Sequence, residues 1–366
     1  MISNQILQST IDGLKSITKR DLSVLEAEGS LLATTEDARS ARDIAFSAEA
    51  LEDGDDGMIV KGHQLFRIMD GTELAYVVAV SGEGEDAYKV GKIAAFQLQG
   101  LLIAYKERYD KDNFVKNLLL DNLLLVDIYM RAKKLHIENN VARCVFLIES
   151  NNDRDTNASV IDVIRGIYPI KNRDFITAVD ENNIILVKDV SDDSSRTALE
   201  KTASTIGDML SSEAMGRARI AMGSVVNDLR DISRSYKEAK IALEVGKIFY
   251  EEKNIINYNR LGIGRLIYQL PLPLCKMYIE EIFKDIRVED FDEETLNTVN
   301  KFFENSLNIS ETSRQLYIHR NTLVYRLDKL QKNTGLDVRT FDDAITFKIA
   351  LMVAKYMNYM EKNGFR

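Results

Sequence analysis

A run of polar and cationic side chains near the end of the chain has the spacing of one helix face. Leu323, Leu327 and Leu330 recur at helical spacing and predict a buried stripe. The opposite side of that helix carries amide, hydroxyl, phenol and cationic groups. These groups suit the major groove of DNA, where Arg and Asn contact base edges and Lys and Thr reach phosphates. The residues predicted to contact DNA are Thr312, Arg314, His319, Arg320, Asn321, Thr322, Tyr325, Arg326 and Lys329.

The sequence around this face predicts two short helices joined by a tight turn. Ser310 is expected to cap the first helix, because its hydroxyl accepts a hydrogen bond from a backbone amide one turn later. Leu316 and Ile318 bracket the turn, and the second helix begins near Arg320. The alternative interpretation is an ordinary helical hairpin with a solvated face, since helix pairs of this kind are common.

The motifs of this segment also resemble those of a known family. They are Ser310-Glu311-Thr312, Leu316, His319-Arg320-Asn321-Thr322-Leu323, Tyr325-Arg326-Leu327, Thr334-Gly335-Leu336-Asp337 and Asp342-Asp343-Ala344. Over roughly residues 300 to 357 they resemble the C-terminal helix-turn-helix of the PucR/CdaR-type bacterial transcriptional regulators, which include the sugar-diacid regulators. The resemblance implies a sequence-specific, dimeric regulator that binds double-stranded DNA.

The charge of the chain bears on this expectation. The formal net charge is −9, whereas phosphate contacts need cations. Between Ile309 and Thr334, however, five cations face two acids and leave a local charge of +3. A local basic patch is sufficient for a specific DNA-binding module on an acidic protein. The alternative is that the overall charge excludes DNA.

Composition limits the remaining functions. At 366 residues, with 45% hydrophobic and 29% charged residues, the chain is expected to form two or three globular domains. No signal peptide or membrane span is recognised, so we expect a cytoplasmic protein without membrane contact. Cys144 and Cys275 have no partner at metal-ligand or redox spacing, and three histidines are scattered. We therefore expect neither a metal site nor a cofactor.

The first 84 residues are expected to form a small α/β sensor of PAS or Cache type. An amphipathic helix is predicted over 2–18 and a polar, alanine-rich helix over 36–51. The predicted strands are 22–25, 31–33, 58–61, 64–69 and 74–80.

This domain loosely resembles the N-terminal ligand-recognition domain of the sugar-diacid regulators. That family has an Arg-Ile-Gly and a nearby His where this chain has Ala38-Arg39-Ser40-Ala41-Arg42, so a diacid ligand does not carry over. A small anionic effector, such as a carboxylate, is still expected, because guanidinium groups suit carboxylates. The candidate ligand-binding residues are Arg39, Arg42, Lys61, His63 and Arg67. The alternative is that these are ordinary surface cations.

Residues 85–137 show nearly unbroken helical periodicity. One apolar stripe includes Val90, Leu98 and Tyr105, and a second runs from Phe114 through Leu118 to Leu125. We interpret the segment as signalling helices that pack against their twins in a homodimer or higher oligomer. A pair of core helices within one domain is the alternative.

Residues 138–270 follow the order β-α-β-β-α-β plus a helix, which is the ferredoxin-like split βαβ plan. The segment Gly223-Ser224, Asp231-Ile232, Ser235-Tyr236, Glu238-Ala239 and Ala242-Leu243 resembles part of the GGDEF-like domain of the same regulators. The predicted hairpin at 180–183 lacks the glycine pair that a nucleotide cyclase needs. We therefore expect a non-catalytic domain, with a nucleotide-binding enzyme as the alternative.

The sequence thus predicts an α+β multidomain protein: a PAS/Cache-like sensor (1–84), signalling helices (85–137), a degenerate GGDEF-like domain (138–270) and an all-α helix-turn-helix domain (271–366). The expected function is that of a ligand-responsive transcriptional regulator without enzymatic activity. The competing hypothesis is a sensor or scaffold that acts through protein partners rather than DNA.

Overall fold

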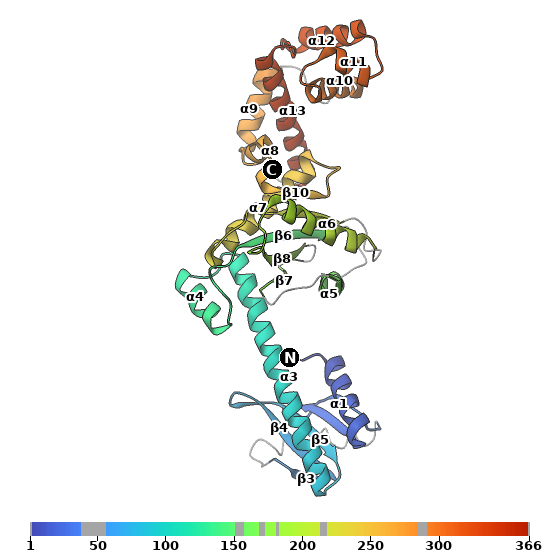
Figure 1. Cartoon of the computed structure of the whole chain (residues 1–366), viewed down its shortest axis with the longest axis vertical. Helices are drawn as coiled ribbons and strands as arrows, with labels where there is room; N and C mark the ends of the chain where they lie inside the picture. Colours follow the sequence, from blue (N-terminus) through green and yellow to red (C-terminus); the bar gives the residue numbers. More distant parts are fainter. Residues whose placement is uncertain are drawn as a thin grey trace. The chain divides into compact units, whose positions relative to one another are not determined.

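The computed structural model describes residues 2–37, 56–150, 157–167, 173–180, 183–212, 218–283 and 291–364 (Figure 1). The chain divides into two compact units, Met1–Phe114 and Val115–Arg366, which are described separately below. The predicted helix over 36–51, apart from its first two residues, and the candidate residues Arg39 and Arg42 lie outside the described residues.

The first unit contains a five-stranded antiparallel sheet in the order β2-β1-β5-β4-β3. Its strands are β1 (Leu22–Glu26), β2 (Leu31–Thr34), β3 (Met58–Val60), β4 (His63–Asp70) and β5 (Glu73–Ser81). All five predicted strands are present, with ends shifted by at most one residue. The tight turns at Gly62 and Gly71 have positive φ angles, which glycine adopts without a steric penalty.

Two helices contribute to the hydrophobic core on one face of this sheet: α1 (Asn4–Thr18) and the long α3 (Glu85–Leu119). Leu7 and Ile11 of α1 and Ala94 of α3 are fully buried. At Gly91 the long helix comes so close to β4 that a Cβ atom would lie 1.8 Å from the Phe66 ring. The glycine thus permits close packing of helix on sheet.

The helical run after residue 85 ends earlier than its periodicity predicts. Helix α3 stops at Leu119, Asp121 adopts a left-handed φ of 62°, and α4 occupies only Leu125–Lys134. The expected second stripe is therefore interrupted, and Leu125 is 50% exposed. The boundary between the two units falls within α3, after Phe114.

The second unit contains another five-stranded sheet, in the order β10-β9-β6-β8-β7. The strands are β6 (Arg143–Ser150), β7 (Phe175–Ala178), β8 (Asn183–Asp189), β9 (Ala218–Met222) and β10 (Ile255–Asn257). The intervening helices are α5 (Asn157–Ile167), α6 (Arg196–Ser212) and α7 (Ile232–Phe249). Strand β6 lies between β8 and β9, so the predicted split βαβ plan is present.

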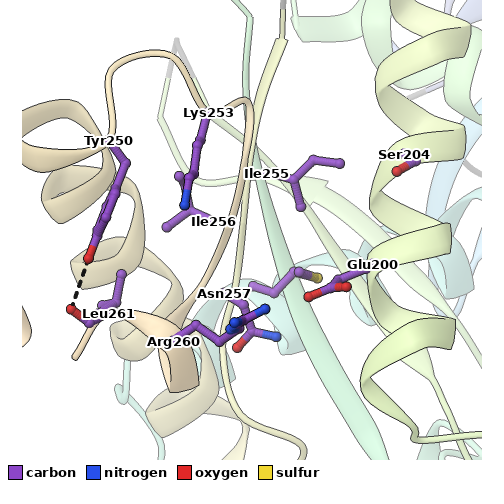
Figure 2. Close-up of a pocket in the computed structure, with 10 residues that line it drawn as sticks. Glu200, Ser204, Tyr250, Lys253, Ile255, Ile256, Asn257, Arg260 and Leu261 are labelled. Atoms are coloured by element: carbon purple, nitrogen blue, oxygen red, sulfur yellow. Dashed lines mark hydrogen bonds between the residues drawn. The ribbon is translucent and has the colours of Figure 1, made fainter. Parts of the chain in front are cut away.

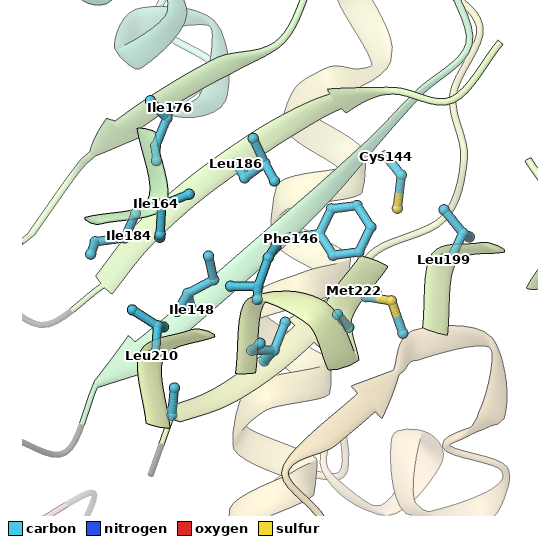
Figure 3. Close-up of a cluster of buried hydrophobic side chains, with 14 of the residues drawn as sticks. Cys144, Phe146, Ile148, Ile164, Ile176, Ile184, Leu186, Leu199, Leu210 and Met222 are labelled. Atoms are coloured by element: carbon cyan, nitrogen blue, oxygen red, sulfur yellow. The ribbon is translucent and has the colours of Figure 1, made fainter. Parts of the chain in front are cut away.

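Both faces of this sheet pack against helices. Figure 3 shows the core on one face, where Phe146 and Leu186 from the strands meet Leu199 and Leu210 from α6. On the other face α7 approaches the end of β9, where the Ser235 hydroxyl donates to the Ser224 carbonyl and accepts from the Val145 amide.

Strand β10 was not predicted from the sequence. It pairs in parallel with β9 and forms an edge of the sheet. After it come the short helices η3 (Tyr258–Arg260) and α8 (Ile263–Ile267).

The remaining helices are α9 (Leu272–Phe283), α10 (Glu293–Glu304), α11 (Ile309–Gln315), α12 (Arg320–Thr334) and α13 (Phe341–Lys362). Helix α13 contributes to two hydrophobic clusters. Phe347 and Ala350 pack with residues of α10 and α12, whereas Val353 and Tyr356 pack with Ile248 of α7. The closing helix therefore serves both the helix-turn-helix bundle and the neighbouring α/β domain.

In the described part of the chain, none of the helices has the length and apolar character that crossing a membrane requires.

Candidate DNA-binding site

Two helices and the turn between them build the candidate site. Asn308 caps α11 by accepting from the Glu311 amide, so the prediction that Ser310 is the cap is wrong by two residues. His319 caps α12, because its Nδ1 accepts from the Asn321 amide at 3.2 Å. In the neutral ring the proton therefore lies on Nε2, where it can be donated to an external acceptor.

The apolar stripe of α12 lies in the core, as the sequence predicts. Leu323, Leu327 and Leu330 are at most 2% exposed, and they pack with Val299 and Phe302 of α10. This burial fixes the rotation of α12 about its axis, and it therefore determines which residues face solvent.

Seven of the nine predicted DNA-contacting residues are exposed: Arg314, His319, Arg320, Asn321, Thr322, Tyr325 and Lys329. They lie on the last turns of α11 and along one side of α12, and Tyr325 is 69% exposed. Arg314 forms an ion pair with Glu311 at 2.6 Å. Neither Arg320 nor Lys329 forms an ion pair with a residue that the structure describes. Their charges are therefore available to an external anion.

The other two predicted residues lie elsewhere. Thr312 is fully buried, and its hydroxyl donates to the Asn308 carbonyl. The side chain of Arg326 is only 21% exposed, pairs with Glu294 and donates to the Thr298 hydroxyl at 3.0 Å. Arg326 thus fastens α12 to α10, and the structure does not present Thr312 or Arg326 on the solvent face.

One exposed residue of the site was missed in the sequence. Tyr317, in the turn between the helices, is 96% exposed and has a φ of 54°. Its neighbours Leu316 and Ile318 pack into the core, which directs the Tyr317 side chain outward. An aromatic residue between two apolar residues in a turn is a weak signal, but the phenol hydroxyl is a suitable phosphate donor.

The segment after α12 is held by polar contacts. Gly335 ends the helix with a φ of 78°, and the Asp337 amide donates to the Asp343 carboxylate. Arg339 binds Asp337 at 2.6 Å and Asp328 at 2.8 Å. The hydrogen bond from Arg339 lowers the pKa of Asp337 and outweighs burial, which raises it. These contacts join the end of α12 to the start of α13.

The candidate ligand-binding residues of the first unit that the structure describes are Lys61, His63 and Arg67. Lys61 lies in the turn before β4 with a φ of 47°. His63 and Arg67 lie on the same face of β4, because alternate residues of a strand share a face. His63 contacts Glu36 at 2.7 Å, and Arg67 contacts Asp56 at 3.5 Å. Both side chains therefore already have a carboxylate partner within the fold.

The hairpin of the α/β domain offers little chemistry. The Asp180 carboxylate accepts from the backbone and the side-chain amide of Asn183. The described residues contain no group of three His, Cys, Asp or Glu side chains placed to hold a metal ion.

Comparison with known proteins agrees with this architecture. Residues 295–353 match the PucR C-terminal helix-turn-helix domain, and residues 123–245 match the GGDEF-like domain. These matches, together with the relatives described next, support a transcriptional regulator of the PucR/CdaR type.

Two relatives make the class more specific. The carbohydrate diacid regulator of Escherichia coli (strain K12) is 23% identical over 295 residues, which cover 77% of each chain. The purine catabolism regulatory protein of Bacillus subtilis (strain 168) is 25% identical over 138 residues, which are 37% of this chain and 26% of that protein. These homologues are regulators rather than enzymes.

A solved structure is also similar to this chain: the regulator of polyketide synthase expression from Bifidobacterium adolescentis. It has 15% sequence identity and covers 67% of this chain and 92% of that chain. Its TM-score of 0.33 is too low to support an argument.

Proposed function

We propose that this protein is a dimeric, ligand-responsive transcriptional regulator that binds operator DNA through α12. The observation that carries the proposal is the exposed face of α12, where Arg320 and Lys329 have no ion-pair partner among the described residues. A buried stripe on the opposite side of the helix fixes this face toward solvent.

The roles of the side chains follow from their chemistry. Asn321 and Arg320, in the first turn of α12, are suited to bidentate contacts with base edges. Thr322, Tyr325 and Lys329 are suited to phosphate contacts, which fix the register of the helix on the duplex. We leave Thr312 and Arg326 out of the contact set because their polar groups are engaged inside the bundle.

Effector binding is proposed for the first unit. Its antiparallel sheet, in which β1 and β2 join a three-stranded β3-β4-β5 run, supports a sensor of PAS or Cache type. A small carboxylate is the proposed effector, and Lys61, His63 and Arg67 are its candidate contacts. Such a ligand would compete with Glu36 and Asp56 for His63 and Arg67, so binding would rearrange these ion pairs.

Dimerisation through the helices of residues 85–137 is part of the same proposal. Two copies would place two α12 helices on half-sites about one turn of DNA apart. Sedimentation of the purified protein tests this: a monomer at micromolar concentration would rule out the dimer. The proposed setting is the cytoplasm.

We propose a non-catalytic role for the GGDEF-like domain, since Asp180 at the hairpin is satisfied by Asn183 rather than presented to a metal. Incubation of the protein with GTP and Mg²⁺ is expected to give no product. Formation of a cyclic nucleotide would overturn this proposal.

The decisive experiment for DNA binding is in vitro selection of DNA fragments by the full chain and by Asn321→Ala. The wild type is expected to enrich an inverted repeat. The variant should lose roughly 1–3 kcal/mol of discrimination at one base pair of each half-site.

Asn333→Ala is the matched control, because Asn333 is an exposed amide near the end of the same helix. It should select the same sequence as the wild type. If the wild type enriches no sequence at moderate salt, the DNA-binding proposal fails and the partner-binding hypothesis replaces it.

A further inference from the structure

A hollow of about 400 Å³ lies in the second unit, between α6 and the segment that follows α7 (Figure 2). Its volume is within the range of roughly 300–1,000 Å³ that small-molecule sites occupy. The hollow lies at the β10 edge of the sheet, whereas the hairpin at Asp180 joins β7 and β8 at the opposite edge. It is therefore separate from the position where a catalytic hairpin would act.

The hollow combines an apolar floor with a polar rim. Met222, Ile256 and Leu261 line it from below but are buried, and Ile255 is the partly exposed apolar side chain among these four. Figure 2 shows that Glu200 and Ser204 project from α6, while Lys253, Asn257 and Arg260 come from the segment after α7. The exposed lining is therefore mixed, with more polar than apolar surface, and its polar groups can orient a small ligand.

The charged side chains of the rim differ in whether they form an ion pair within the fold. Glu200 is paired with Arg196 at 2.8 Å. Lys253 and Arg260 form no ion pair with any residue in the described ranges, and Lys253 lies over the Tyr250 ring, 4.9 Å from its centroid. Two cations without a carboxylate partner beside an apolar floor favour an anionic ligand with an apolar body.

The walls of the hollow are held in place without a ligand. The Tyr250 hydroxyl donates to the Leu261 carbonyl at 3.3 Å, and the Asn257 side chain accepts from the Asn259 amide. Strand β10 pairs with β9 and forms an edge of the sheet within the described residues. The site is therefore largely formed before a ligand binds.

We propose that this hollow is a binding site for a small aliphatic carboxylate. Lys253 and Arg260 bind the carboxylate, and the short hydrocarbon body lies against Ile255. The proposal concerns ligand binding by the α/β domain and does not depend on whether the protein binds DNA.

Calorimetric titration of the full chain tests the proposal. The probes are propanoate, butanoate, pentanoate and 4-methylpentanoate, each beside the neutral amide of the same carbon skeleton. At least one carboxylate should bind at millimolar or lower concentration, and its amide should bind at least about tenfold more weakly.

Variants then locate the site. Lys253→Gln and Arg260→Gln should each weaken binding about tenfold, because each removes one charge-assisted hydrogen bond. Arg234→Gln changes an exposed arginine on α7 away from the hollow and should leave binding unchanged.

Arg67→Gln distinguishes this site from the proposed effector site of the first unit. Retained binding in Arg67→Gln together with weakened binding in Arg260→Gln supports the proposal. The reverse pattern places the carboxylate in the first unit and overturns it. Equal binding of acid and amide, or no binding of any of the carboxylates, overturns it as well.

Discussion

In the helix-turn-helix, Arg320 and Lys329 form no ion pair with a carboxylate of the described residues, whereas His63 and Arg67 of the first sheet each lie against a carboxylate. The same residue types thus have two different roles. A compensated cation holds parts of the fold together, and an uncompensated one is available to an external anion. Arg326 shows that the two kinds occur in one helix, because it pairs with Glu294 while Arg320 does not.

The largest expected effect concerns a compensated cation. Lys247 of α7 contacts Glu149 at 2.6 Å and Glu244 at 3.0 Å. Burial lowers its pKa, but the hydrogen bonds to the two glutamates outweigh burial, so the pKa of Lys247 is raised. Lys247→Met leaves two partly buried carboxylates without a cation, and should lower the free energy of unfolding by about 2–4 kcal/mol in urea denaturation.

Lys240→Met is the control on the same helix, since Lys240 is exposed and lies beside the Tyr236 ring rather than a carboxylate. It should change the free energy of unfolding by less than about 0.5 kcal/mol. Equal free energies of unfolding of the two variants would show that the carboxylate contacts of Lys247 do not stabilise the fold.

For the uncompensated cation Arg320, the expected change is in DNA binding. Arg320→Gln should weaken binding to the selected operator about tenfold, because one charge-assisted contact is lost. Its urea midpoint should match the wild type, since no contact within the bundle is removed. Electrophoretic mobility shift and urea denaturation on the same preparation measure both. Loss of stability without loss of DNA binding would show that Arg320 stabilises the bundle and does not contact DNA.

Arg326→Gln is expected to lower stability and leave DNA binding unchanged, and its effect should be smaller than that of Arg320→Gln. It removes the hydrogen bond to Thr298, and should lower the free energy of unfolding by about 1 kcal/mol. At a temperature where the variant is fully folded, its operator affinity should equal that of the wild type. If the stability is unchanged but binding is lost, Arg326 contacts DNA directly.

The smallest effect is a pH dependence in the first unit. Burial raises the pKa of Asp56, but hydrogen bonds from Lys92 and Arg67 outweigh burial and hold the pKa below its ordinary value of 3.8. A carboxyl group with a lowered pKa contributes stability above its unfolded pKa and loses it as the pH falls through the folded value. Arg67→Gln should therefore make the loss of stability below about pH 4 shallower. Urea denaturation in acid, measured by circular dichroism, compares the slopes, and a steeper slope in the variant would contradict this.

Much of the architecture could be predicted from local patterns. The strands of the first sheet and the split βαβ order of the second follow from alternating apolar residues and short turns. The solvent face of α12 was predictable because Leu323, Leu327 and Leu330 fix its rotation. In these cases the signal lies within one element.

The features that the sequence did not predict either have no local marker or depend on distant residues. The end of α3 at Leu119 is followed by a left-handed residue, Asp121, with no glycine or proline to mark it. The pairing of Arg326 depends on Glu294, which is 32 residues away. The hollow at β10 combines Glu200 with residues after Tyr250, so no motif in the chain indicates it.

Helix α13 sets a limit on how this class of chain can be divided or recombined. Its first half completes the DNA-binding bundle, while Val353 and Tyr356 pack with Ile248, and the Tyr359 hydroxyl donates to Glu244. A chimera that exchanges the helix-turn-helix of two regulators would therefore inherit a mismatched surface along α13. A working chimera requires that the second half of α13 and the surface of α7 be transferred or redesigned together. The helix-turn-helix and the α/β domain are therefore expected to change together in sequence.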